Sequence, residues 1–215
     1  MDKKPLQGDN MVVDNYVDGF LLKSLTKGAV WAFRIWIPSS PFIVLGRFSR
    51  EEEEIKEESY LPIKRRLGGG CSVVLYPGTI IVSVALKRSL REEFFPKDWI
   101  AFFNETIISA LRDIGINEIL EKGWGDIAYG NKKLGGISLY SSKEAILYQL
   151  SLLYSIDFKL ISENLKHPPR EPDYRKGRDH IEFLTSIKEI MPGFSLEKLI
   201  FSIERRLKEA LSSLA

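Results

Sequence analysis

Alternation of apolar and polar positions predicts β-strands in the first half of the chain. Bulky apolar side chains stand at every second position of residues 30–38, and a proline ends this run. Residues 42–45 form a shorter apolar run that predicts a second strand. Two β-branched runs, residues 71–76 and 79–86, flank a Pro-Gly pair at positions 77–78. Because Pro-Gly is a turn signal, we expect these two runs to pair as a hairpin.

Apolar positions spaced by three and four residues predict two long helices. Residues 97–114 have this spacing and are followed by Gly115, which favours helix termination. Residues 196–211 carry a second apolar stripe after Ser195, a favourable N-cap residue. Residues 51–56 begin with four glutamates, which indicate a short helix on a solvated surface.

Together these elements favour one α+β domain. Strands dominate the first half, helices punctuate it and close the chain, and residues 123–154 combine glycine-rich turns with β-prone segments. We find no internal repeat, low-complexity tract or linker in the sequence. We therefore predict a single domain over residues 1–215, with a mixed, mainly antiparallel sheet flanked by helices.

Composition narrows the class of protein without locating a site. The chain has 215 residues, 44% of them hydrophobic, and a net charge of +2, which suits a globular domain and makes a nucleic-acid partner unlikely. Its one cysteine, Cys71, excludes an internal disulfide framework, and two histidines are too few for a three-histidine zinc site. No stretch approaches the roughly 20 apolar residues that span a bilayer. We therefore expect a soluble cytoplasmic protein with no membrane partner.

A run of three glycines preceded by basic residues is the first candidate site. Gly68, Gly69 and Gly70 follow Arg65 and Arg66, and the next element is a predicted strand. Bare backbone lets a ligand approach, its amides can face an anion, and the arginines can add charge-assisted contacts. The alternative, a flexible turn with solvated basic side chains, is equally compatible with an isolated glycine triplet. A P-loop does not fit, because no Gly-Lys-Ser/Thr follows.

A second cluster of lysines and glycines lies at residues 131–138. It contains Lys133 and Gly136 and comes shortly after Asp126. A lysine in this setting can stabilise charge that develops on a phosphate or carbonyl oxygen. Taken alone, this cluster is better interpreted as a hairpin turn with exposed lysines. Two such clusters in one small domain favour convergence on one anionic small molecule.

These motifs resemble those of lipoate-protein ligases and their octanoyltransferase relatives. Residues 65–71 resemble the family's arginine and glycine loop, with Cys71 in the place of an alanine. Residues 133–138 are similar to its Lys-x-x-Gly-x-Ala motif, and residues 125–127 occupy the place of Asn-Asp-Ile. Residues 40–47 and 172–178 show weaker similarity to other segments of the family, so that the resemblance extends over most of the chain.

The resemblance implies a fold, a reaction and partners. The fold would be that of biotin and lipoate ligases, related to class II synthetases, without a C-terminal accessory domain. Lipoate or octanoate would be activated with ATP and Mg²⁺ as an acyl-adenylate and transferred to a lysine of an acceptor lipoyl domain. That acceptor would be a glycine cleavage H protein or a dehydrogenase E2 component, and a separate small accessory subunit could assist.

The resemblance also assigns residues. Lys133 would contact the acyl carboxyl group and the phosphate, and it would be catalytic. Asp126 would orient Lys133 or Mg²⁺, although no metal ligand is assigned with certainty. The remaining substrate and ATP contacts would come from Arg65, Gly68, Gly69, Gly70, Cys71, Ser72, Asp126 and Gly136.

Two other functions stay open. An octanoyl or lipoyl transferase that needs no ATP could carry its acyl group as a thioester on Cys71, whose thiol stands beside glycines and arginines. A non-catalytic binding subunit of a split ligase would keep the anion-binding loops without the complete activity.

Overall fold

The computed structural model describes residues 15–214 and places the strands in two sheets. The larger sheet has six strands in the order β1-β5-β9-β8-β7-β6, and every neighbouring pair is antiparallel. The smaller sheet has the order β3-β2-β4, in which β2 is parallel to β3 and antiparallel to β4. The strands are β1 (Trp31–Trp36), β2 (Phe42–Leu45), β3 (Ile63–Arg65), β4 (Val73–Leu75), β5 (Thr79–Lys87), β6 (Ile119–Lys122), β7 (Asp126–Tyr129), β8 (Lys132–Ser141) and β9 (Ala145–Leu153). The predicted mixed, mainly antiparallel α+β fold is confirmed.

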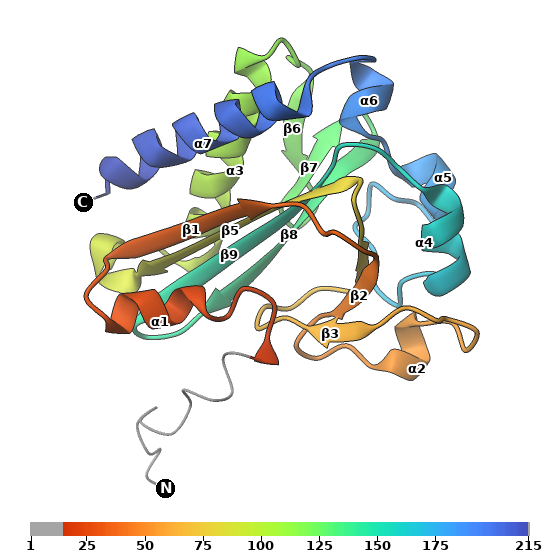
Figure 1. Ribbon diagram of the computed structural model, residues 1–215, viewed down its shortest axis with the longest axis horizontal. Coiled ribbons are helices and arrows are strands. Elements are labelled where there is room, and N and C mark those ends of the chain that lie inside the picture. The colour runs from red at the N-terminus through yellow and green to blue at the C-terminus, as the bar shows by residue number, and fades with distance from the viewer. Residues whose placement is uncertain (1–14, 215) are drawn as a thin grey trace, which may run out of the picture.

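Helices cover both faces of the larger sheet. The two long helices, α3 and α7, lie on one face, whereas α1 lies on the other beside β1 and β5 (Figure 1). The smaller sheet and α4 lie to the right in this view (Figure 1). The helices are α1 (Leu21–Thr26), α2 (Glu51–Glu54), η2 (Arg88–Arg91), α3 (Pro96–Asp113), α4 (Phe158–Asn164), α5 (His180–Phe183), α6 (Ile187–Ile190) and α7 (Leu196–Ser212). None of the helices within residues 15–214 has the length and apolar character needed to cross a bilayer.

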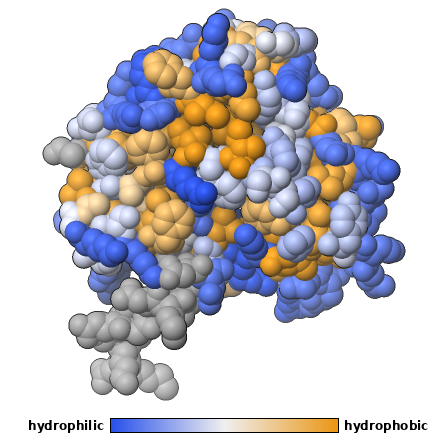
Figure 2. Space-filling model, viewed as in Figure 1, coloured by the Kyte–Doolittle hydropathy of each residue, from blue (hydrophilic) through white to orange (hydrophobic). Residues whose placement is uncertain are grey.

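The largest core lies between the six-stranded sheet and helices α3 and α7. From β5, Val82 and Val84 point into this core, while the alternate residues Ile81 and Ala85 belong to smaller clusters on the opposite face. Apolar residues of β1 and α7 complete the packing, and apolar surface gathers between these two elements in Figure 2. Burial of each aliphatic side chain contributes about 1.5–3 kcal/mol, so this layer dominates the stability of the fold.

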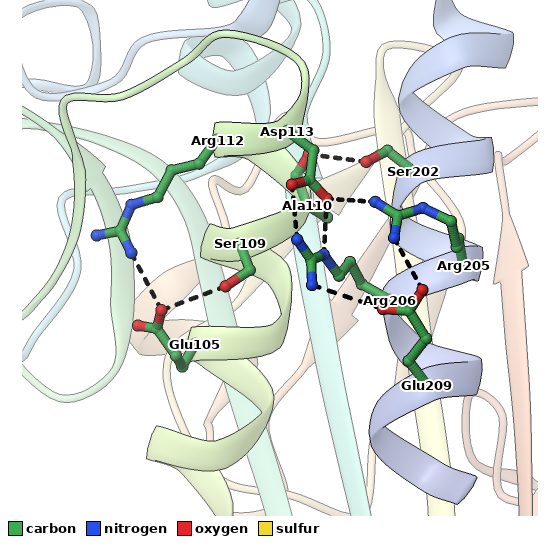
Figure 3. A network of polar contacts seen from close by, with 9 residues as sticks. All are labelled: Glu105, Ser109, Ala110, Arg112, Asp113, Ser202, Arg205, Arg206 and Glu209. Carbon is green, nitrogen blue, oxygen red and sulfur yellow. Dashed lines mark hydrogen bonds and ion pairs between the residues drawn. The ribbon is translucent and has the colours of Figure 1, made fainter. Parts of the chain in front are cut away.

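Polar contacts fix α3 against α7 at the edge of this core. Asp113 near the end of α3 accepts hydrogen bonds from Arg206 Nε at 2.6 Å and Arg206 Nη2 at 2.7 Å (Figure 3). Arg206 holds the pKa of Asp113 below its usual range. Deeper in the interface, Ser202 donates to the carbonyl oxygen of Ala110 at 2.9 Å (Figure 3).

A buried asparagine links the core to the edge of the site. Asn104 of α3 has no exposed surface and accepts a hydrogen bond from the Tyr148 hydroxyl at 2.8 Å. Its Nδ2 donates to Glu121 at 2.7 Å and to the carbonyl oxygen of Gly125 at 3.0 Å. Because Gly125 immediately precedes Asp126, this contact fixes the position at which β7 begins.

The two predicted long helices and the strands at residues 30–38 and 42–45 are confirmed, with small differences at their ends. Ser195 caps α7 as expected by accepting a hydrogen bond from the Lys198 amide.

The predicted hairpin of residues 71–76 and 79–86 is wrong. Both strands form, and the Thr79 amide closes the expected turn on the Tyr76 carbonyl at 2.8 Å. However, β4 pairs with β2 in the smaller sheet, whereas β5 pairs with β1 and β9 in the larger one. The strand β5 is buried almost throughout, so it requires a neighbour on each side, and the Pro-Gly turn carries the chain from one sheet to the other.

Candidate active site

A cavity of about 730 Å³ lies between the two sheets. The strands β2 and β4 supply one wall, β5, β8 and β9 supply another, and apolar residues of α4 and α5 close one side. Most of its surface is apolar, which suits an aliphatic ligand. Asp126 is the one carboxylate among the lining residues within 15–214. Five lining residues carry a lysine or arginine charge: Arg47, Arg66, Lys133, Arg170 and Arg175.

The glycine loop, residues 68–71, borders this cavity with its carbonyl groups already bonded. The Gly68 carbonyl accepts from the Arg47 amide at 2.9 Å, and the Gly69 carbonyl accepts from Ser138 Oγ at 3.1 Å. The Gly70 carbonyl accepts from Ser49 Oγ at 3.1 Å. In contrast, the amides of the last three loop residues donate to no acceptor within residues 15–214. Free backbone amides beside a cavity are groups that can bind an anion.

A buried arginine and a buried glutamate support the loop from behind. Arg66 is 6% exposed and donates from Nη2 to the carbonyl oxygens of Gly69 and Cys71, each at 2.8 Å. Burial lowers the pKa of Arg66 to about 10, and the nearby Glu54 carboxylate opposes this shift. Glu54, which is 4% exposed, accepts hydrogen bonds from the amide and hydroxyl groups of Ser72. The expectation that α2 is simply solvated is therefore wrong for Glu54.

These contacts change the roles expected of Arg65 and Ser72. Arg65 Nη1 donates to the carbonyl oxygens of Gly46 at 2.6 Å and Ser49 at 3.0 Å, so its guanidinium holds the preceding loop. Ser72 lines the cavity, but Glu54 already engages both of its donors. The structure therefore gives both side chains structural contacts, and their direct contacts with a substrate stay predictions.

Lys133 and Asp126 form an ion pair on the cavity wall. Lys133 Nζ lies 2.7 Å from Asp126 Oδ1, and their side chains are 27% and 12% exposed. Asp126 Oδ2 accepts a hydrogen bond from the Tyr174 hydroxyl at 2.9 Å. Burial and the Asp126 carboxylate raise the pKa of Tyr174, so its hydroxyl stays protonated and remains a donor. The ammonium group is therefore oriented before any ligand arrives.

Gly136 provides the space that this ammonium occupies. A Cβ atom at position 136 would lie 2.8 Å from both Cε and Nζ of Lys133. We expect Gly136→Ala to displace the lysine tip and to reduce activity about 100-fold, because small misplacements of a catalytic group have effects of this size. The unfolding midpoint should change little, because the end of a lysine side chain can move. Unchanged turnover of the variant in the reaction that the sequence resemblance implies, measured by pyrophosphate exchange, would contradict this role.

The segment 166–180 forms a further wall of the cavity. Cys71 Sγ donates to the carbonyl oxygen of Arg170 at 3.5 Å, and Arg178 Nη2 donates to the carbonyl oxygen of Asn131 at 2.8 Å. His180 also lines the cavity, at the start of α5. Burial and the nearby Arg175 charge lower the pKa of His180 to about 4, so its ring is neutral at pH 7.

Most of the residues predicted from the sequence lie together on this cavity, and several of their neighbours were not predicted. Lys133, Asp126, Gly69, Gly70, Cys71 and Gly136 all line one cavity. The sequence did not predict Glu54, Tyr174 or Arg175 as site residues. Only the weak family similarity of residues 172–178 pointed to Tyr174 and Arg175.

Of the two roles predicted for Asp126, its contacts favour orientation of Lys133 over binding of magnesium. Both of its carboxylate oxygens are engaged, one by the Lys133 ammonium and one by the Tyr174 hydroxyl. No group of three His, Cys, Asp or Glu side chains within residues 15–214 is arranged to hold a metal ion. The other role predicted for Asp126, orientation of Lys133, agrees with the geometry.

Comparison with known sequences finds relatives over most of the chain. The family model for the lipoyl protein ligase A/B catalytic domain matches residues 14–208. An inactive lipoate-protein ligase 2 from Plasmodium falciparum is 24% identical over 204 residues, which cover 75% of this chain and 53% of that protein. The chain spans about half the length of the curated relatives it matches.

Solved structures share the fold. A crystal structure of lipoate-protein ligase A bound with ATP has a TM-score of 0.76 and 20% identity, and the match covers 91% of this chain and 78% of that one. The bipartite lipoate protein ligase of Thermoplasma acidophilum, described together with its E2 lipoyl domain, has a TM-score of 0.74 and 20% identity. That match covers 89% of this chain and 77% of that one.

Proposed function

The chain belongs to the lipoyl protein ligase A/B catalytic-domain family, and on that basis we propose that it activates lipoate or octanoate with ATP and transfers the acyl group to a lipoyl domain. The observation that carries this proposal is the convergence of two features on one cavity. The oriented Lys133 ammonium and the free amides of the glycine loop both border it. Together they supply cationic and dipolar groups for a carboxylate and a phosphate.

The cavity suits both parts of an acyl-adenylate. Its apolar wall includes Ile161, Leu165 and Phe183, which can pack against an aliphatic chain. The ion pair and the glycine loop provide the polar part, where a carboxylate and the α-phosphate can meet. ATP as the second substrate is supported by the ATP-bound relative of the same fold.

The proposed reaction has two steps and needs no side-chain nucleophile. A carboxylate oxygen of the acyl substrate attacks the α-phosphate, the bond to the β-phosphate breaks, and pyrophosphate leaves. The ε-amine of the acceptor lysine then attacks the acyl carbonyl, loses a proton, and expels AMP as an amide forms. Lys133 stabilises the negative charge that develops on phosphate and carbonyl oxygens, and Asp126 and Tyr174 keep its ammonium in place.

Lipoate-dependent exchange between ATP and pyrophosphate tests the first step. The chain alone is expected to catalyse exchange only when lipoate or octanoate is present. No exchange with either acid would reject the proposal that this chain adenylates its substrate. Transfer is tested next with a lipoyl domain of the H-protein or E2 type and its lysine-to-alanine variant, by mass spectrometry.

A split ligase is the second candidate, because a bipartite ligase shares the fold. In that case exchange by this chain would require a separate small subunit, and the addition of that subunit would restore it. The cysteine-based transferase has weaker support. Within residues 15–214 the hydrogen-bond partner of the Cys71 thiol is the Arg170 carbonyl oxygen, which cannot serve as its base.

A further inference from the structure

Arg175 is a buried cation of the cavity wall that has an unused hydrogen-bond donor. Its side chain is 5% exposed, and its Nε donates to the carbonyl oxygen of Arg178 at 2.9 Å. The guanidinium carbon lies 4.8 Å from the centre of the Phe183 ring. Nη2 is buried and has no hydrogen-bond partner within residues 15–214. A buried donor without an acceptor is unfavourable, so an acceptor from a ligand would satisfy it.

The surroundings hold this guanidinium in place and give it a carboxylate partner that it shares with other donors. Glu171 Oε2 lies 3.4 Å from Arg175 Nε, but the same carboxylate also accepts from His167 Nε2 at 3.0 Å. The Gly177 amide donates to its other oxygen at 2.7 Å. Burial lowers the pKa of Arg175, and Glu171 and Asp179 only oppose that shift. The Arg175 guanidinium therefore lies at the cavity wall and keeps one N–H donor without an acceptor.

The charges that line the cavity exceed what an acyl carboxylate would balance. Asp126 is the one carboxylate among the lining residues within 15–214, and Lys133 is paired with it. The guanidinium of Arg66 is turned toward loop carbonyls. Arg47 and Arg170 have no carboxylate partner within residues 15–214, and Arg175 shares Glu171 with His167. An excess of this size suits a polyphosphate better than a single carboxylate.

We propose that Arg175 binds the nucleotide, with its guanidinium donating to a phosphate oxygen of ATP in addition to the contact supplied by Lys133. This inference rests on the proposed function and extends it to a residue outside the glycine loop and the lysine motif. The proposal assigns Arg175 to one of the two substrates: its guanidinium binds a phosphate of the nucleotide, and the acyl carboxylate binds elsewhere in the cavity. Arg175 acts in binding, with no proton transfer assigned to it.

Titration calorimetry on the Arg175→Gln variant tests this assignment. The probes are α,β-methylene-ATP and, in separate titrations, octanoate. Loss of one charge-assisted hydrogen bond is expected to raise the Kd of the nucleotide analogue about 10- to 100-fold. The Kd of octanoate should stay within about two-fold, since the lost contact is to phosphate. Arg112→Gln is the matched control, because Arg112 is exposed and pairs with Glu105 on the far surface of α3; both Kd values should be unchanged.

Each other outcome overturns the inference. An unchanged Kd for the nucleotide analogue removes Arg175 from the binding site, and weakening of octanoate alone identifies the bound anion as the carboxylate. Equal weakening of both ligands indicates a structural role. If Arg175→Gln does not fold, Arg175→Lys is used instead, because lysine keeps the positive charge but lacks the planar guanidinium. A nucleotide Kd of Arg175→Lys equal to that of wild type again overturns the assignment. Failure of the wild-type chain to bind nucleotide counts against the proposed function itself.

Discussion

Replacement of Lys133 with alanine is expected to slow acyl-adenylate formation by about 100- to 1,000-fold, the usual effect of removing one preorganised donor from a developing anion. Lys133 Nζ is held 2.7 Å from Asp126, and Asp126 is held in turn by Tyr174. The ammonium therefore needs no reorganisation when charge builds on the phosphate and carbonyl oxygens. The measurement is lipoate-dependent pyrophosphate exchange at saturating ATP, compared with the wild-type chain.

Two control variants distinguish the loss of the Lys133 ammonium from a general loss of positive charge and from unfolding. Lys132→Ala removes an exposed lysine from the adjacent position of β8, and its rate should stay within about two-fold of wild type. The double variant Asp126→Asn/Lys133→Met avoids leaving a carboxylate unpaired, and it should be folded and equally inactive. A folded Lys133→Ala variant with wild-type exchange would remove Lys133 from the proposed mechanism.

The strands and helices with strong local patterns were predictable because one face of each is buried. The pairing of β4 and β5 was not, although their turn was read correctly. In Thr79–Lys87 the first eight residues are buried, which is typical of a strand with neighbours on both sides. Residues 80–86 are apolar except for Ser83, and a run of this kind favours a central strand over one strand of an isolated hairpin.

The candidate site was predictable where its chemistry lies within a short motif. Gly68, Gly136 and Lys133 stand out in the sequence, and close packing around each glycine explains why no larger residue stands there. A Cβ atom on Gly68 would lie 2.0 Å from Ser138 Oγ, a contact between the two motifs that neither motif alone reveals. Residues that act through distant partners were not predictable, and Glu54 is the clearest case. It ends a run of four glutamates, but Ser72 and Arg66 make it a buried residue.

The two adjacent arginines illustrate the same limit. The residues alone left both arginines as candidate anion ligands, and the resemblance to the family assigned the substrate contact to Arg65. The structure gives both arginines backbone partners, with Arg65 bonded to the loop before β3 and Arg66 bonded to the glycine loop. Which of two neighbouring side chains is buried depends on the face of β3 and on the residues packed there, neither of which the local sequence specifies.

Replacement of Arg66 with methionine is expected to destabilise the protein by about 3–5 kcal/mol, the usual cost of removing one partner from a buried ionic network. The substitution leaves the carbonyl oxygens of Val44, Gly69 and Cys71 without their Arg66 donor and removes the positive charge that interacts with Glu54. Urea unfolding measures the change. Because total stabilities of domains are about 5–15 kcal/mol, the variant should fold in water but unfold at a much lower urea concentration.

Arg65→Met is the matched control, because it changes the same residue type at the next position. Its guanidinium is only partly buried, so its carbonyl partners can gain water, and we expect a loss of about 1 kcal/mol. Glu54→Gln in the Arg66→Met background should recover about 1–2 kcal/mol, because it removes the buried charge that the first substitution leaves unpaired. An Arg66→Met variant as stable as Arg65→Met would show that the glycine loop does not depend on this network. The free amides of the loop would then owe their orientation to Ser49 and Ser138 instead.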